Sequence, residues 1–180
     1  MEAAVYILFV LGCLGATDIA VYHSIAHGIR SHPDSRAELV VHSLRGPTYA
    51  SLFLLVPNFA MHGLFFWCLI GLFTVDVGIS VWDFALERHS RQFFGGLPSG
   101  EYVLHIIIAM LFGGLVTAVF FGAGEWATLP TWIGYAPADV PTFLRGVMAV
   151  MAVLVFASGV QDGIAAFRLR GLPPRSRIAV

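Results

Sequence analysis

The sequence contains no lysine, and charged residues fill only 12% of its 180 positions, about half the share found in a typical soluble domain. Its ten basic residues are balanced by eleven acidic ones, so the chain has no excess positive charge with which to bind nucleic acid. Hydrophobic residues make up 58% of the chain, and the mean hydropathy is +0.81. This composition predicts an integral membrane protein without a nucleic-acid partner.

Sequence motifs for common cofactors are also missing. The two cysteines, Cys13 and Cys68, lie in apolar stretches and do not form the CxxC spacing of a thiolate metal site. We interpret them as small buried hydrophobic residues. The glycines form neither a phosphate-binding loop nor a dinucleotide fingerprint, so any nucleotide cofactor would belong to a partner protein.

Five apolar segments are separated by proline and glycine turns, the first two of which contain Pro33 and Pro57. Ser35 and Glu38 have the spacing of a capping box at the start of the second segment. We predict a single all-α domain over residues 1–180, an integral membrane bundle of five transmembrane helices at residues 3–30, 34–56, 59–91, 99–124 and 140–170.

Small residues within these segments predict where helices approach closely. Gly113 and Gly114 lie in the fourth predicted helix, and Gly159 and Gly163 have the GxxxG spacing in the fifth. The second pair suits packing either inside the bundle or between chains. Residues 125–141, which are rich in tryptophan and proline, are expected to form a loop at the membrane surface.

The arginines predict the orientation of the bundle. Only Arg145 falls at one end of the predicted helices, whereas eight arginines fall at the other: Arg30, Arg36, Arg88, Arg91, Arg168, Arg170, Arg175 and Arg177. By the positive-inside rule the arginine-rich end is cytoplasmic, so the N-terminus lies outside and the C-terminus in the cytoplasm. In a bacterial cell this membrane is the inner membrane.

Four pairs of metal-ligand residues, each four positions apart, lie near the cytoplasmic ends of four predicted helices. Residues at this spacing share one helix face. Taken singly, Glu38 also fits a capping box and Glu101 fits a first helical turn. Together the pairs predict a metal centre formed by His23, His27, Glu38, His42, Asp83, Glu87, Glu101 and His105.

Other polar residues are expected to support this centre. On the third predicted helix, His62, Asp76, Ser80, Asp83 and Glu87 fall on one stripe at 100° per residue, but His62 is expected to lie at the outer end of the helix, too far away to join the centre. Buried charges are costly unless they are paired, so we expect Arg45, Tyr49 and Asp76 to neutralise or orient the ligands. The helical phase of Asp18 is about 140° from that of His23. Asp18 is therefore expected to point away from His23 and to share a polar network with Asp162.

This ligand set resembles the carboxylate and histidine shell of four-helix di-iron proteins. The sequence departs from that pattern because its ligand spacing is four instead of three and its helices are membrane-spanning. It also lacks the HxxHH boxes of membrane fatty acid desaturases and hydroxylases. The resemblance is to a type of site, not to a family. It implies two metal ions, with iron favoured by the mixed oxygen and nitrogen ligands.

The leading hypothesis is a membrane oxidoreductase, similar in chemistry to a hydroxylase or desaturase. Two iron ions would activate dioxygen to oxidise a lipid or another hydrophobic substrate, with an electron-donor protein at the cytoplasmic face. One alternative is a haem-binding electron-transfer subunit, with His105 and either His23 or His42 as axial ligands. The other is a zinc-dependent membrane hydrolase that uses metal-bound water.

Overall fold

Five long helices make up most of the protein. The computed structural model describes residues 1–173, except the side chains of residues 88, 89, 93 and 94. The helices are α1 (Glu2–Asp18), α2 (Arg36–Leu55), α3 (Leu64–Ser90), α4 (Ser99–Ala123) and α5 (Thr142–Arg168). The prediction of five helices is confirmed, although two short strands are added to them.

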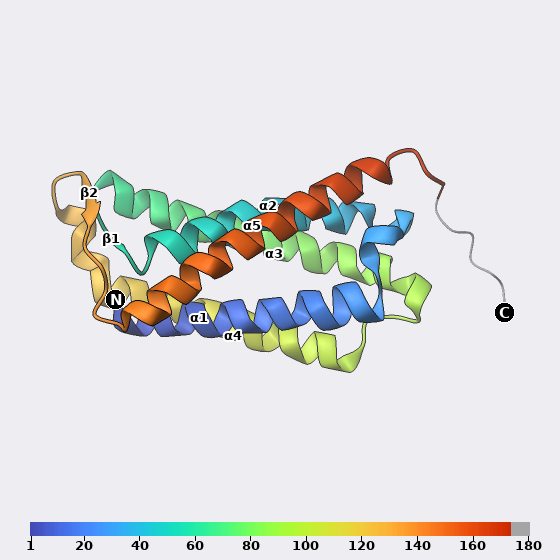
Figure 1. Ribbon diagram of the computed structural model, residues 1–180, viewed down its shortest axis with the longest axis horizontal. Coiled ribbons are helices and arrows are strands. Elements are labelled where there is room, and N and C mark those ends of the chain that lie inside the picture. Colours follow the sequence, from blue (N-terminus) through green and yellow to red (C-terminus); the bar gives the residue numbers. More distant parts are fainter. Residues whose placement is uncertain (174–180) are drawn as a thin grey trace.

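The helices lie alongside one another in an elongated bundle (Figure 1). α1 packs beside α4, α2 packs along α5, and α3 packs against α2. The N-terminus and the two strands lie at one end of the bundle, and α5 runs toward the other end. The core takes buried side chains from every helix, among them Leu8, Phe53, Phe66, Leu115 and Met148.

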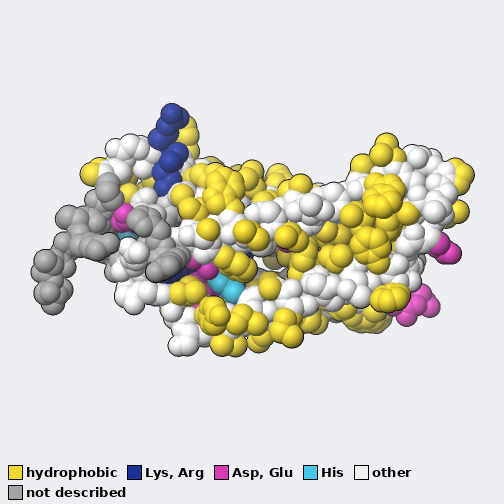
Figure 2. All heavy atoms as spheres, turned by 180° about the vertical axis from the view of Figure 1, so that it is seen from behind, with side chains coloured by type: hydrophobic (Ala, Val, Ile, Leu, Met, Phe, Trp, Pro, Cys, Tyr) yellow, Lys and Arg dark blue, Asp and Glu magenta, His cyan; other side chains and the backbone are white. Residues whose placement is uncertain are grey.

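Four helical segments are long and apolar enough to cross a membrane: Glu2–Ala26, Leu64–Glu87, Ser99–Thr128 and Thr142–Arg168. α2 is not among them, because polar residues in its first half lower its hydropathy. Large apolar side chains face outward, with Phe121 90% and Phe143 82% exposed. Hydrophobic side chains cover the middle of the molecule, and charged ones lie toward its ends (Figure 2). Such an exterior is consistent with a membrane protein.

The first predicted helix changes its character partway along. α1 ends at Asp18 and continues as a π-helix over Ile19–Ala26, in which the N–H of His27 bonds the carbonyl of Tyr22 five residues earlier. Gly28 has a φ of 54° and ends the helix, because this left-handed conformation suits glycine. The helix predicted to reach residue 30 therefore stops at Ala26.

The third predicted helix begins later than expected. Residues 59–62 form the strand β1 (Phe59–His62), which pairs antiparallel with β2 (Trp132–Tyr135). Gly63, with a φ of 55°, turns the chain from β1 into α3. His62 therefore does not belong to the polar stripe of α3, and its ring instead lies against Trp126 and Trp132. β2 also lies within residues 125–141, which were predicted to form a loop.

Two sequence predictions about small side chains are wrong. Cys13 and Cys68 are exposed on the outside of the bundle, where an apolar surface accommodates them as well as a core would. Gly113 and Gly114 have no neighbour within 4 Å of an added Cβ, so no helix approaches them closely. The close approach occurs instead between Gly159 of α5 and Gly46 of α2.

We predict that Gly159→Ala destabilises the bundle whereas Gly114→Ala does not. A Cβ at Gly159 would lie 2.9 Å from the Cα of Gly46, so the two backbones must move apart. Overpacking of this kind costs about 1–3 kcal/mol, which exceeds the gain of about 1 kcal/mol from replacing a helical glycine. The thermal unfolding midpoint in detergent, followed by circular dichroism, should fall for Gly159→Ala. Equal midpoints for the two variants would show that the α2–α5 contact is looser than described.

Candidate metal centre

A cluster of buried polar side chains occupies the end of the bundle opposite the strands. It draws residues from α2, α3, α4 and the π-helix that extends α1. All but one of the eight side chains predicted as ligands are buried, and His105 is partly buried. The alternating direction of the helices brings their polar ends together.

The π-helix determines which side chains meet. In an α-helix Asp18 and His23 would point about 140° apart, but the wider π turn brings residues five apart to the same side. Asp18 Oδ2 lies 3.3 Å from His23 Nε2 and 3.3 Å from His105 Nε2. The prediction that Asp18 points away from His23 is therefore wrong, and the local helix type is the reason.

One group of potential metal ligands consists of Asp18, His23, Glu101 and His105. Each offers one ligand atom, and these atoms lie within 4.8 Å of one another. Two ligand atoms that bind one ion at about 2.1 Å lie at most about 4.2 Å apart, so small side-chain shifts would complete a coordination shell. Two imidazoles and two carboxylates are the donors of this group.

A second group, His23, Glu38 and His42, overlaps the first at His23. The rings of His23 and His42 are stacked, with centroids 4.6 Å apart and planes inclined by 14°. Two protonated imidazoles would repel each other at this distance. The stacking therefore requires at least one of the two rings to be neutral, and the neutral ring is the form in which histidine binds metal ions.

Three predicted ligands lie beside these groups but outside them, in the part of the chain that the structure describes. His27 Nε2 lies 3.3 Å from Glu101 Oε2, and His42 Nε2 lies 3.2 Å from Asp83 Oδ1. Glu87 Oε2 lies 3.3 Å from His105 Nδ1. Carboxylates that contact the second ring nitrogen of a ligating histidine fix its orientation, and Glu87 is placed to do so for His105.

Arg91 is the residue of this centre that sequence reasoning missed. It begins the 3-10 helix Arg91–Phe94 and is 0% exposed. Its guanidinium joins two predicted ligands, with Nη1 2.8 Å from Glu38 Oε2 and Nη2 2.6 Å from Glu101 Oε1. Glu38 also accepts a hydrogen bond from Ser90, whereas Ser35 makes no side-chain capping bond. The capping-box interpretation of Glu38 is therefore wrong.

Burial alone would lower the pKa of Arg91, but its hydrogen bonds to Glu101 and the charge of Glu38 raise that pKa above its usual value. The guanidinium thus stays charged and offsets part of the negative charge. The spacing of four from Glu87 could have indicated that Arg91 lies on the ligand face, but it does not predict the partners Glu38 and Glu101.

Arg45 supports the cluster from the neighbouring turn of α2. Its Nη1 lies 3.0 Å from Asp83 Oδ2, and its Nε lies 3.9 Å from Asp76 Oδ1. The Tyr49 hydroxyl donates to Asp76 Oδ2 at 3.4 Å. These are the contacts expected of residues that neutralise and orient buried carboxylates.

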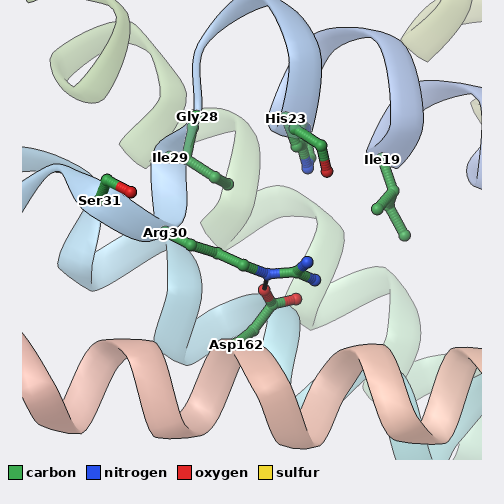
Figure 3. Close-up of a pocket in the computed structure, with 8 residues that line it drawn as sticks. Ile19, His23, Gly28, Ile29, Arg30, Ser31 and Asp162 are labelled. Carbon is green, nitrogen blue, oxygen red and sulfur yellow. Dashed lines mark hydrogen bonds and ion pairs between the residues drawn. The ribbon is translucent and has the colours of Figure 1, made fainter.

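Asp162 of α5 lies apart from this network. It lines a cavity of about 180 Å³ beside His23, where Arg30 points toward it (Figure 3). Arg30 Nε donates to Asp162 Oδ1 at 2.6 Å, and Arg30 Nη2 donates to Ser158 Oγ at 2.9 Å. Asp162 is thus paired with Arg30, and the network predicted between Asp18 and Asp162 is not formed among the described residues.

Several ligand-type atoms in the cluster have no hydrogen-bond partner in the described part of the chain: Asp18 Oδ1, His23 Nδ1, Glu38 Oε1 and Glu87 Oε1. A buried carboxylate oxygen without a partner loses its hydration without compensation. A bound cation would restore the lost interaction, and the imidazole and carboxylate donors fit such an ion. The residues present therefore fit a metal centre.

No family model, curated protein or solved structure matches this chain at a significant level.

We predict that Arg91→Met destabilises the metal-free protein by about 3–5 kcal/mol, the cost of breaking a buried ion pair by removing one partner. Methionine keeps much of the side-chain volume, so the change tests the loss of charge. Arg145→Met is the matched control, because Arg145 lies at the other end and bonds only the hydroxyls of Tyr135 and Thr142 among the described residues. Unfolding in detergent with a chelator should separate the two variants. Equal stability would contradict the proposed role of Arg91.

Proposed function

We propose that this protein is a membrane-embedded di-iron oxidoreductase that acts on a lipid or another hydrophobic substrate. The observation that carries the proposal is the pair of overlapping ligand groups that share His23. They lie at one end of an otherwise apolar bundle, beside carboxylate oxygens that lack a partner.

The donors favour iron because imidazole and carboxylate together suit iron or manganese, and the described ligand groups contain no thiolate. Two ions are supported by the shape of the cluster. Besides the shared His23, one ligand group takes Glu38 and His42 from α2, and the other takes Asp18 from α1 and Glu101 and His105 from α4. Four-helix di-iron proteins use the same two kinds of donor.

The chemistry supplied by such a centre is the activation of dioxygen. In a hydroxylation a C–H bond of the substrate breaks and a C–O bond forms. The second oxygen atom leaves as water with two protons and two electrons from a donor protein. The chain's own residues hold the ligands in place: Glu87 orients His105 and Arg91 limits the charge on Glu101. The apolar helices around them limit access of water.

The location follows from the arginines and the apolar exterior. Four candidate spans support insertion in a membrane. We place the metal centre at the cytoplasmic face of a bacterial inner membrane because most arginines lie toward that end of the helices. A soluble electron donor could reach the centre from that side.

The two alternatives differ in what the cluster would hold. Both axial pairs considered for a haem include His105, and this is disfavoured because each ring nitrogen of His105 already faces a carboxylate, Nε2 that of Asp18 and Nδ1 that of Glu87. His23 and His105 approach the same oxygen of Asp18, which is a crowded setting for axial ligands. Zinc fits two histidines and two carboxylates and would support hydrolysis instead of oxidation.

The test is elemental analysis and absorption spectroscopy of the detergent-purified protein, prepared without chelators. We expect about two irons per chain and no Soret band. Bound zinc would replace the proposed function with that of a hydrolase. A Soret band would replace it with that of a haem protein. Absence of any metal would identify the cluster as a buried ionic network.

Asp18→Ala provides a sharper prediction, because only the π-helix brings this residue to the centre. We expect it to lose at least about half of the bound metal, since one ion loses a ligand. His62→Ala is the control, because His62 is a partly buried histidine that lies against Trp126 and Trp132 at the opposite end of the bundle. Full metal content in folded Asp18→Ala protein would remove Asp18 from the ligand set.

A further inference from the structure

A second cavity, of about 280 Å³, lies between α3 and α4 at the end that contains the metal centre. It is lined mostly by apolar and aromatic side chains from both helices and from the turn that joins them. Two polar residues complete the lining, so the full set is Phe84, Glu87, Leu97, Tyr102, His105, Ile106 and Ala109.

The side-chain packing between α3 and α4, here called the seam, differs between its two ends. Toward the strands it is closed by edge-to-face aromatic pairs, Phe66 with Phe120 and Phe73 with Phe112. At the metal end α3 contributes Phe84, whose ring lies 5.4 Å from that of His105. The cavity is found at this end, where the paired phenylalanines stop.

The cavity opens on the outer surface of the bundle. Tyr102 is 57% exposed, Ile106 43% and Phe84 42%. These residues belong to two helices that are long and apolar enough to cross a membrane. Histidine and acidic side chains are visible between hydrophobic side chains on one face of the molecule (Figure 2). The cavity therefore faces bilayer lipid if the helices are inserted.

The inner wall of the cavity reaches the metal centre. Glu87 and His105 contact each other through Oε2 and Nδ1, and His105 Nε2 faces Asp18. The mostly apolar cavity thus includes in its wall His105, a residue of the first ligand group. At about 280 Å³ it is slightly smaller than typical pockets for compact drug-sized ligands, which suits a slender chain better than a fused-ring molecule.

We propose that this cavity binds one acyl chain of a membrane phospholipid and presents it to the metal centre. The proposal rests on the proposed function for its chemistry, although binding of the chain can be tested separately. The occupant follows from the surroundings: the cavity is apolar and opens toward the bilayer, where phospholipid chains are the most abundant apolar groups.

The depth of His105 specifies which part of the chain is presented. His105 lies six residues into α4, about 9 Å from its start at a rise of 1.5 Å per residue. A phospholipid headgroup remains at the interface near that helix end. The carbons beside His105 therefore belong to the headgroup-proximal half of the acyl chain, not to its methyl end. Tyr102, one turn nearer the interface, is placed to contact the ester region.

The test is photo-crosslinking in nanodiscs with a phosphatidylcholine that carries a diazirine in the headgroup-proximal half of one chain. We expect enriched labelling of the α4 peptide that contains Tyr102 and Ile106. Ile106→Trp fills the cavity and should reduce this labelling at least about 5-fold. Val103→Trp is the matched control, because Val103 is exposed on α4 but does not line the cavity, and it should leave the labelling unchanged.

A second variant, a second probe and a competitor make the result of the crosslinking experiment decisive. Ala109→Met is a second, smaller blocking variant if Ile106→Trp fails to fold, and a probe with the diazirine at the methyl end should label this peptide less. Excess free fatty acid should compete weakly with the phospholipid. Labelling that is equal in all variants would show only annular lipid and overturn the proposal, as would stronger labelling by the methyl-end probe.

Metal content measured on the same samples separates this proposal from the proposed function. Cavity labelling without bound metal would support the lipid site and reject the oxidoreductase. Bound iron with no effect of Ile106→Trp on labelling would reject the lipid site alone. Ile106→Trp should leave the metal content unchanged, since Ile106 belongs to neither ligand group.

Discussion

The structure depends on the neutralisation of charge inside an apolar bundle. Two arginines, Arg45 and Arg91, face six buried carboxylates in the described cluster: Asp18, Glu38, Asp76, Asp83, Glu87 and Glu101. Each unpaired charge at such a site costs several kcal/mol. The arginines cannot balance six negative charges, so histidines, protons or metal ions must supply the remainder. This imbalance is the physical basis for interpreting the cluster as a binding site and not only as a set of ion pairs.

The same constraint explains the unusual local backbone. A regular α-helix would direct Asp18 and His23 toward different sides. The π-helix Ile19–Ala26 removes that problem by bringing both residues to His105 and Glu101. π turns are less favourable than α turns and are frequent at functional sites. α2 shows a related compromise, since the residues it contributes to the cluster lower its hydropathy below that of the other four helices.

Much of this arrangement was predictable because it depends on spacing and chain direction. Two ligands four residues apart share a helix face whatever the tertiary packing. Because successive helices run in opposite directions, pairs near the end of one helix and the start of the next lie at the same end of the bundle. The helical phase was a less reliable guide to which side chains share a face when the residues were further apart in the sequence. The position of Asp18 depended on a π turn that periodicity does not reveal, and that of His62 on a strand that forms only through pairing with β2. Arg91 was counted among the arginines that predict the orientation, and its burial between Glu38 and Glu101 was not predicted because these partners come from other helices.

The division of contacts among the helices also bears on access to the site. α1 packs on α4 and α2 packs on α5, and Arg91 links the α2 and α4 carboxylates. α3 joins the cluster through Asp83 and Glu87, whose partners are histidines on α2 and α4. The cluster is therefore cross-linked between helices by side chains, while the backbones of α3 and α4 remain apart beside Phe84. A chain that enters this seam would displace apolar contacts and leave the ion pairs intact. An apolar opening can thus lie next to the most polar part of the molecule, where the charged residues in its wall, Glu87 and His105, are paired with each other.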